Sequence, residues 1–78
     1  MDLQEHFDDA MFDFSQGKAG DAIAKLKAIL EQNADFFDAQ LALGAAYYNK
    51  GDYAAAIAEG HKAEKMRTTI APGYPAVG

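Results

Sequence analysis

Hydrophobic residues recur at intervals of three and four positions in four stretches of the chain. This is the spacing of one face of an α-helix. It is clearest in the first stretch, where Phe7, Met11 and Phe14 lie one helical turn apart. The pattern predicts helices near residues 3–16, 19–32, 36–49 and 53–66.

The residues between these stretches are typical of helix ends. Gly17 and Gly51 follow the first and third stretches, where glycine can take the left-handed conformation that closes a helix. Asp35 and Asp52 precede the third and fourth stretches, and we expect each to be an N-cap. Residues 68–78 contain no charge, two prolines and two glycines, which predicts an extended, flexible tail.

The chain also contains an internal repeat, because residues of the first half align with residues 34 positions later in the second half. This offset aligns identical residues, and we expect each repeat to be a helical hairpin. We expect Ala22 in the first hairpin and Ala56 in the second to be buried, each at a close crossing of two helices. The identical pairs are Gly17 with Gly51, Ala22 with Ala56, Ile23 with Ile57 and Ala24 with Ala58.

The first helix carries two carboxylates where the second repeat has large side chains. Asp9 and Asp13 align with Leu43 and Tyr47. Burying carboxylates without partners costs several kcal/mol. We therefore expect the first helix to be rolled, so that Phe7, Met11 and Phe14 point inward while both carboxylates stay in water.

Composition adds that the core is small and built from small side chains. Apolar residues make up 50% of the chain, and alanine is by far the commonest of them, which favours closely packed helices and an all-α fold. Residues 1–39 hold nine acidic and three basic residues, which argues against nucleic-acid binding. The chain has no cysteine, no secretory signal and no membrane-length apolar run, so we expect a cytoplasmic protein without a membrane partner.

Few residues suggest chemistry. His6, Asp9 and Asp13 share a helical stripe of metal-ligand types, and a solvated acidic face explains that stripe better. His61 lies among basic residues near the end of the fourth helix, where we expect it to be solvated. No nucleophile, base and orienting acid occur in a recognisable set. The expectation is a protein that is not an enzyme and has no cofactor or metal.

The motif Leu43-Gly44-x-x-Tyr47-x-x-x-Gly51-x-Tyr53-x-x-Ala56 resembles the tetratricopeptide repeat, a helix-turn-helix unit of protein-interaction solenoids. The first repeat resembles it through Ala10, Gly17, Ala22, Leu26 and Ile29. The resemblance implies an α-solenoid fragment of two stacked hairpins in residues 1–67, with repeats at about 3–34 and 37–67 and a non-helical tail at 68–78. It also implies a scaffold or adaptor that binds another protein.

Family members that bind acidic peptide tails use lysine and asparagine at places that here hold Phe7, Met11 and Ala42, so the resemblance disfavours that ligand. We expect instead a concave groove for an apolar or amphipathic segment of a partner protein. For the aromatic and methionine residues of the first helix, a place in the core is an equal alternative. The groove residues are Phe7, Met11, Phe14, Leu41, Ala45, Tyr48 and Asn49.

Self-assembly is the alternative function. Solenoids expose the apolar side of their last helix unless something covers it. Ile57, Met66 and Ile70 would then pair two copies into a homodimer, with no separate peptide ligand. A metal-binding or enzymatic function would rest on the His6 stripe alone.

Overall fold

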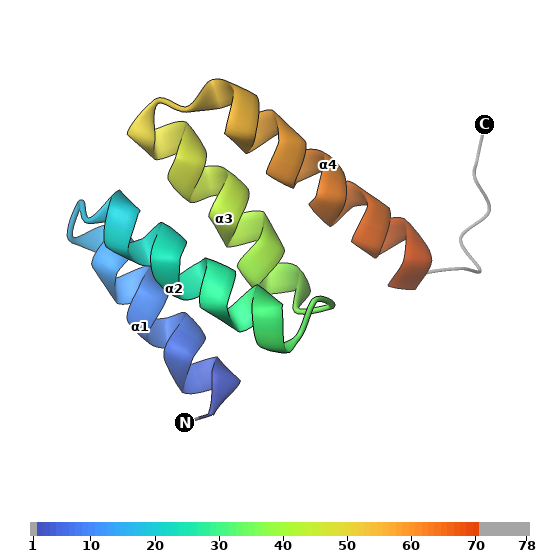
Figure 1. The fold of residues 1–78 in the computed structure, drawn as a ribbon, viewed down its shortest axis with the longest axis horizontal. Coiled ribbons are helices and arrows are strands. Elements are labelled where there is room, and N and C mark those ends of the chain that lie inside the picture. Colours follow the sequence, from blue (N-terminus) through green and yellow to red (C-terminus); the bar gives the residue numbers. More distant parts are fainter. Residues whose placement is uncertain (1, 71–78) are drawn as a thin grey trace.

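Four helices form two antiparallel hairpins, α1 (Leu3–Ser15) with α2 (Ala19–Gln32) and α3 (Phe37–Lys50) with α4 (Tyr53–Ile70) (Figure 1). The computed structural model describes the backbone of residues 2–70 and the side chains of residues 2–67. Within this part of the chain there is no strand. The predicted all-α fold of two stacked hairpins is confirmed.

The turns inside the two hairpins are built alike. Gly17 and Gly51 both have positive φ, +80° and +96°, as predicted from their place after a helix. The N–H of Lys18 donates to the carbonyl of Asp13, and that of Asp52 to the carbonyl of Tyr47, at 2.9 and 3.0 Å. Each hydrogen bond lies within one repeat, and its donor and acceptor align with the donor and acceptor of the other bond. The sequence repeat is therefore also a structural repeat.

Of the two predicted N-caps, the one of α4 is confirmed and the one of α3 is wrong. Asp52 does cap α4, because its Oδ1 accepts from the N–H of Ala55 at 3.3 Å. Asp35 is not the cap of α3, which begins after Phe36 without a side-chain cap. The N–H of Asp35 instead donates to Oδ1 of Asn33 at 3.1 Å, within the loop between the hairpins.

The fourth helix is longer than predicted. It continues to Ile70 rather than ending near Met66, so residues 68–70 of the expected tail are helical. No glycine or proline occurs between His61 and Ala71 to end the helix earlier. Pro72 is the next proline, and it disfavours the helical conformation of the residue before it, Ala71. Residues 71–78 of the predicted tail lie outside the described residues.

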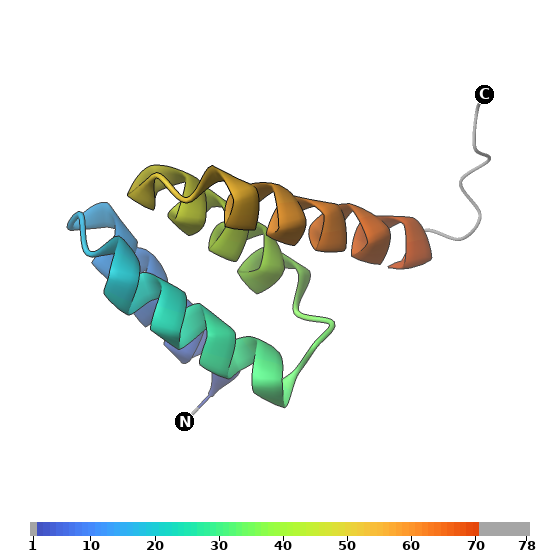
Figure 2. The ribbon, with the colours of Figure 1, turned by 45° about the horizontal axis from the view of Figure 1, so that its top comes forward.

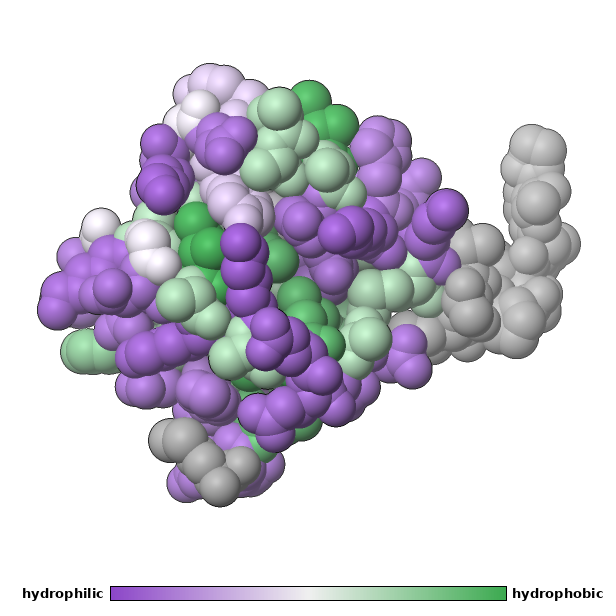
Figure 3. Space-filling model, viewed as in Figure 1, coloured by the Kyte–Doolittle hydropathy of each residue, from purple (hydrophilic) through white to green (hydrophobic). Residues whose placement is uncertain are grey.

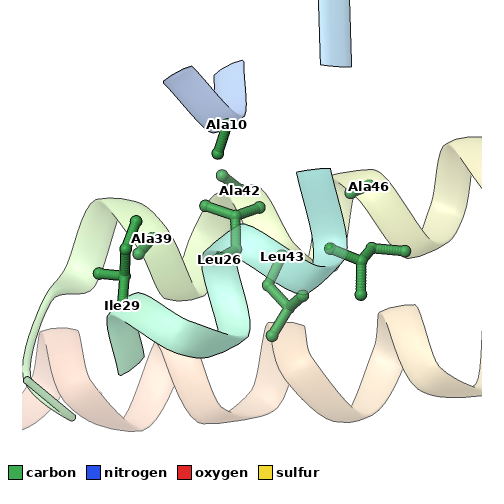
Figure 4. Close-up of a cluster of buried hydrophobic side chains, with 8 residues drawn as sticks. Ala10, Leu26, Ile29, Ala39, Ala42, Leu43 and Ala46 are labelled. Carbon is green, nitrogen blue, oxygen red and sulfur yellow. The ribbon is translucent and has the colours of Figure 1, made fainter. Parts of the chain in front are cut away.

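The core lies where the second hairpin rests on the first. α2 packs against both α1 and α3, α3 packs against α4, and α1 also touches α3 (Figure 2). Half of the residues in the main buried cluster are alanines, which let the helices approach closely (Figure 4). The cluster consists of Ala10, Ile23, Leu26, Ile29, Ala39, Ala42, Leu43 and Ala46.

The two hairpins differ in how deeply their crossings are buried. Ala22 is fully buried as expected, but Ala56, its counterpart in the second repeat, is only half-buried. The crossing itself is close, since a Cβ on Gly44 would lie 3.5 Å from the carbonyl oxygen of Ala56. α3 covers the first hairpin, whereas no other described helix covers this side of the second.

The first helix is rolled as predicted, with one correction. Phe7, Met11 and Phe14 pack against the core. Asp9 is exposed, but the Asp13 side chain is only 14% exposed and therefore not in water. Lys25 on α2 explains how it is tolerated, because Lys25 Nζ lies 2.6 Å from Asp13 Oδ2 and 2.9 Å from Asp9 Oδ2.

Substitution of Gly44 tests the close crossing. Gly44→Leu should overpack α3 against α4 and lower the free energy of unfolding by about 1–3 kcal/mol. Gly44→Ala meets only ordinary van der Waals contacts and should change stability by less, within about 1 kcal/mol, because alanine favours helix. Urea denaturation of both variants measures this. Equal stability of the two variants would contradict the close crossing.

Lys25→Met tests the ion-pair cluster through its pH dependence. Hydrogen bonds to Asp13, and then to Asp9, raise the pKa of Lys25 above 10.5. A raised lysine pKa stabilises the fold fully below the unfolded pKa, and this contribution is lost as pH rises through the folded pKa. Wild type should therefore be more stable than Lys25→Met at pH 7–9, and the difference should shrink above about pH 10.5. A pH-independent difference would show that lost packing of the lysine stem explains the effect.

Candidate functional site

The residues predicted to form the groove fall into two groups, one packed against the core and one exposed. Phe7, Met11 and Phe14 of α1 are half-buried against the core, and the ring of Phe7 stacks on Phe36 with centroids 5.5 Å apart. The four groove residues on α3 are all exposed, and Leu41 and Tyr48 are the large ones among them. The α1 half of the prediction therefore lies in the packing between the repeats. The exposed residues are Leu41, Ala45, Tyr48 and Asn49.

The exposed part of α3 borders a hollow of about 510 Å³ between α3 and α4, which we call the α3/α4 groove. The rings of Tyr48 and Tyr53 meet edge to face at 5.1 Å and form one end of it. Figure 3 shows hydrophobic residues at the surface over the first turns of α4. No lining residue is charged. The groove is lined by Gly44, Tyr48, Tyr53, Ala56 and Ile57.

The α3/α4 groove has a covered counterpart in the first repeat. Ile57 is 61% exposed, whereas Ile23, its counterpart in the first repeat, is 7% exposed. Tyr53 is 58% exposed and its counterpart Ala19 only 8%. In the first repeat, α3 lies over this surface. The groove is therefore the surface on which a third hairpin would rest.

A second hollow, of about 300 Å³, borders α2, α3 and α4, and most of the side chains that line it are charged or polar. Nε2 of the buried Gln40 donates to the carbonyl oxygen of Glu59 at 3.2 Å and to its Oε1 at 2.5 Å. Lys62 also approaches Glu59, at 3.5 Å. Lys27 lies 5.7 Å over the ring of Tyr47, and a hydrogen bond with Tyr47 raises the pKa of Lys27. Gln40 and Glu59 therefore link α3 to α4 within the second hairpin, and Lys27 and Tyr47 link α2 to α3 between the hairpins.

Comparison with known proteins identifies the repeat. The family model described as tetratricopeptide repeat matches residues 13–75. The chain belongs to the tetratricopeptide repeat family. Neither curated proteins nor solved structures gave a match. Tetratricopeptide repeats generally mediate protein–protein interactions and are generally not catalytic.

Two of the three residues of the metal-ligand stripe in the first tetratricopeptide repeat are ion-paired. Asp9 and Asp13 both contact Lys25, and His6 is half-buried on the same helix. Among the described residues, no three side chains of His, Asp or Glu are grouped to hold a metal ion. His61 is exposed on α4. Within residues 2–70, no helix combines the length and apolar character of a membrane span.

The residues predicted for self-association fall in different places. Ile57 lies in the α3/α4 groove, Met66 is half-buried, and the side chain of Ile70 lies outside the described residues. Sequence reasoning missed Tyr53 as a groove residue, although Tyr53 is part of the tetratricopeptide motif. The signal that could have found it was the repeat alignment, which pairs Tyr53 with Ala19 of the first repeat.

Two matched substitutions test whether the groove is uncovered. Ile23→Ala should lower the free energy of unfolding by about 2–5 kcal/mol, because it opens a cavity under α3. Ile57→Ala should change it by only about 0.5 kcal/mol in a monomer, as exposed substitutions do. Denaturation at low micromolar concentration compares them. Similar losses in the two variants would show that Ile57 is already covered within the chain.

Proposed function

We propose that this chain is a protein-interaction module that takes a helix of a partner protein into the α3/α4 groove. The observation that carries the proposal is the difference in exposure between Ile57 and Ile23, at equivalent places in the two repeats. In the first repeat the same kind of surface binds a helix, namely α3. An apolar groove that binds an amphipathic helix is a common mode of recognition.

The face of α3 that rests on the first repeat shows what such a partner helix should look like. Ala39, Ala42 and Ala46 are buried there, with Leu43 beside them. Small residues one turn apart let two helices approach closely, and a single larger apolar residue fills the remaining space. We therefore expect a partner helix with small residues at positions i, i+3 and i+7 of one face.

This proposal keeps Tyr48 of the groove predicted from sequence as a wall of the α3/α4 groove. Leu41, Ala45 and Asn49 are exposed on the same helix, outside the residues that line the groove. Tyr53 and Ile57 of α4 take the place of the α1 residues, which pack against the core. Because the lining carries no charge, an acidic peptide would gain no ion pair in the α3/α4 groove.

A helical peptide copied from the chain itself tests the proposal. The probe is residues 36–50 with a staple joining positions 41 and 45, which lie on the exposed face of α3. The staple is needed because isolated helices of about 15 residues are marginal in water. Fluorescence anisotropy of the labelled peptide should show saturable binding to the chain, measured at low micromolar protein.

Three controls define the site. Ile57→Glu should weaken peptide binding at least about 10-fold, because it places a charge in an apolar contact. Phe12→Glu alters an equally exposed apolar residue on α1 and should leave binding unchanged. A peptide carrying Ala42→Glu should not bind. Binding that survives Ile57→Glu, or no binding to the unaltered chain, would contradict the proposal.

A further inference from the structure

The occupant of the α3/α4 groove can be specified further, on the basis of the proposed function. We infer that the groove holds α4 of a second copy of this chain, in a two-fold dimer that pairs the two carboxyl-terminal hairpins. Each copy then covers the groove of the other, and the same patch is buried twice.

The first support is the shape of α4 itself. The face of α4 centred on Ile57 is exposed and consists mainly of small or apolar residues. The helix face that fills the equivalent groove of the first repeat, on α3, has alanines around one larger residue. The α4 face resembles it in one respect, since small residues, Ala54 and Gly60, lie on either side of Ile57. Its exposed face comprises Tyr53, Ala54, Ile57, Gly60 and His61.

The second support is that this face complements itself. In an antiparallel pair of α4 helices with the two-fold axis at Ile57, Ala54 of one copy lies opposite Gly60 of the other. Tyr53 then lies opposite His61. Gly60 offers room, since a Cβ added there would meet no atom within 4 Å. Small residues opposite each other at a crossing allow the backbones to approach, with Ile57 of both copies at the centre.

The third support is the other end of the molecule, which excludes stacking of copies head to tail. There the residues of α1 that correspond to the buried face of α3 line an open hollow of about 410 Å³. Three of the four are carboxylates, and within the described residues only Asp9 has an ion-pair partner, Lys25. Head-to-tail stacking would bury them against the apolar Ile57 at a high desolvation cost, which pairing of like ends avoids. The α1 residues are Glu5, Asp8, Asp9 and Phe12.

Sedimentation equilibrium tests the dimer with the full chain. The chain should show a concentration-dependent rise from 8.4 kDa to twice that mass. Ile57→Glu should remain at 8.4 kDa, whereas Phe12→Glu, at a side chain of the same 61% exposure, should dimerise like the unaltered chain. Circular dichroism checks that both variants stay helical. A monomer at several hundred micromolar would overturn the inference.

Cysteine crosslinking tests the symmetry, because the chain contains no cysteine of its own. Ile57→Cys should form a disulfide-linked dimer on oxidation, since residue 57 meets itself at the axis, and Phe12→Cys should form none. A crosslink formed only when the Phe12→Cys and Ile57→Cys chains are mixed would show head-to-tail stacking and overturn the two-fold arrangement.

The outcomes also separate this inference from the proposed function. If the chain is monomeric and binds the stapled peptide, the proposed function stands and the dimer inference is overturned. If the chain dimerises and does not bind the stapled peptide at any peptide concentration, the dimer inference stands and the proposed binding of a partner helix is overturned. A variant ending at Ile70 tests the remaining occupant. If it dimerises while the full chain is monomeric, the chain's own residues 71–78 fill the groove and the inference fails.

Discussion

The contact on which this structure depends is the burial of the first hairpin under α3. Eight apolar residues form the core there, and half of them are alanines. Alanine contributes little area to the core, so the four larger residues of the cluster supply most of its buried apolar area, while the alanines let the helices approach closely. A close approach of this kind needs small residues on both surfaces, which are Ala10 on the first hairpin and Ala39, Ala42 and Ala46 on α3.

The same contact makes the two ends of the molecule unequal. At the amino-terminal end the exposed counterpart of the α3 face carries Glu5, Asp8 and Asp9, which keep it hydrated. At the carboxyl-terminal end the surface that would receive another helix stays apolar, with Ile57 at its centre. Within residues 2–70, α3 covers the first hairpin and no helix covers the α3/α4 groove. The function proposed for this chain follows from that asymmetry.

Local sequence signals predicted the fold well, because they act over a few residues. The glycine turns at Gly17 and Gly51, the helix periods and the repeat offset placed both hairpins correctly. The cap assigned to Asp35 was wrong, since Asn33 organises that loop instead. The partial burial of Asp13 was missed because its partner, Lys25, lies on the next helix, where helical spacing within α1 gives no information.

The candidate site was harder to predict, because exposure depends on what covers a residue. Sequence periodicity gives Ile23 and Ile57 the same place in their helices. Only the packing of α3 buries the first and leaves the second exposed. Phe7 was placed in the groove for the same reason, although its ring contacts Phe36 of the next repeat. Patterns that report a helix face cannot distinguish a covered face from an open one.

A chain with three repeats tests the central claim most directly. Inserting a second copy of residues 33–66 after Met66 keeps the period of the repeat and supplies a helix equivalent to α3 above the α3/α4 groove. The measurement is the loss of unfolding free energy caused by Ile57→Ala in that longer chain. The account predicts a loss close to that of Ile23→Ala, about 2–5 kcal/mol. A loss of about 0.5 kcal/mol or less would contradict it, because Ile57 would then remain exposed beneath an added repeat.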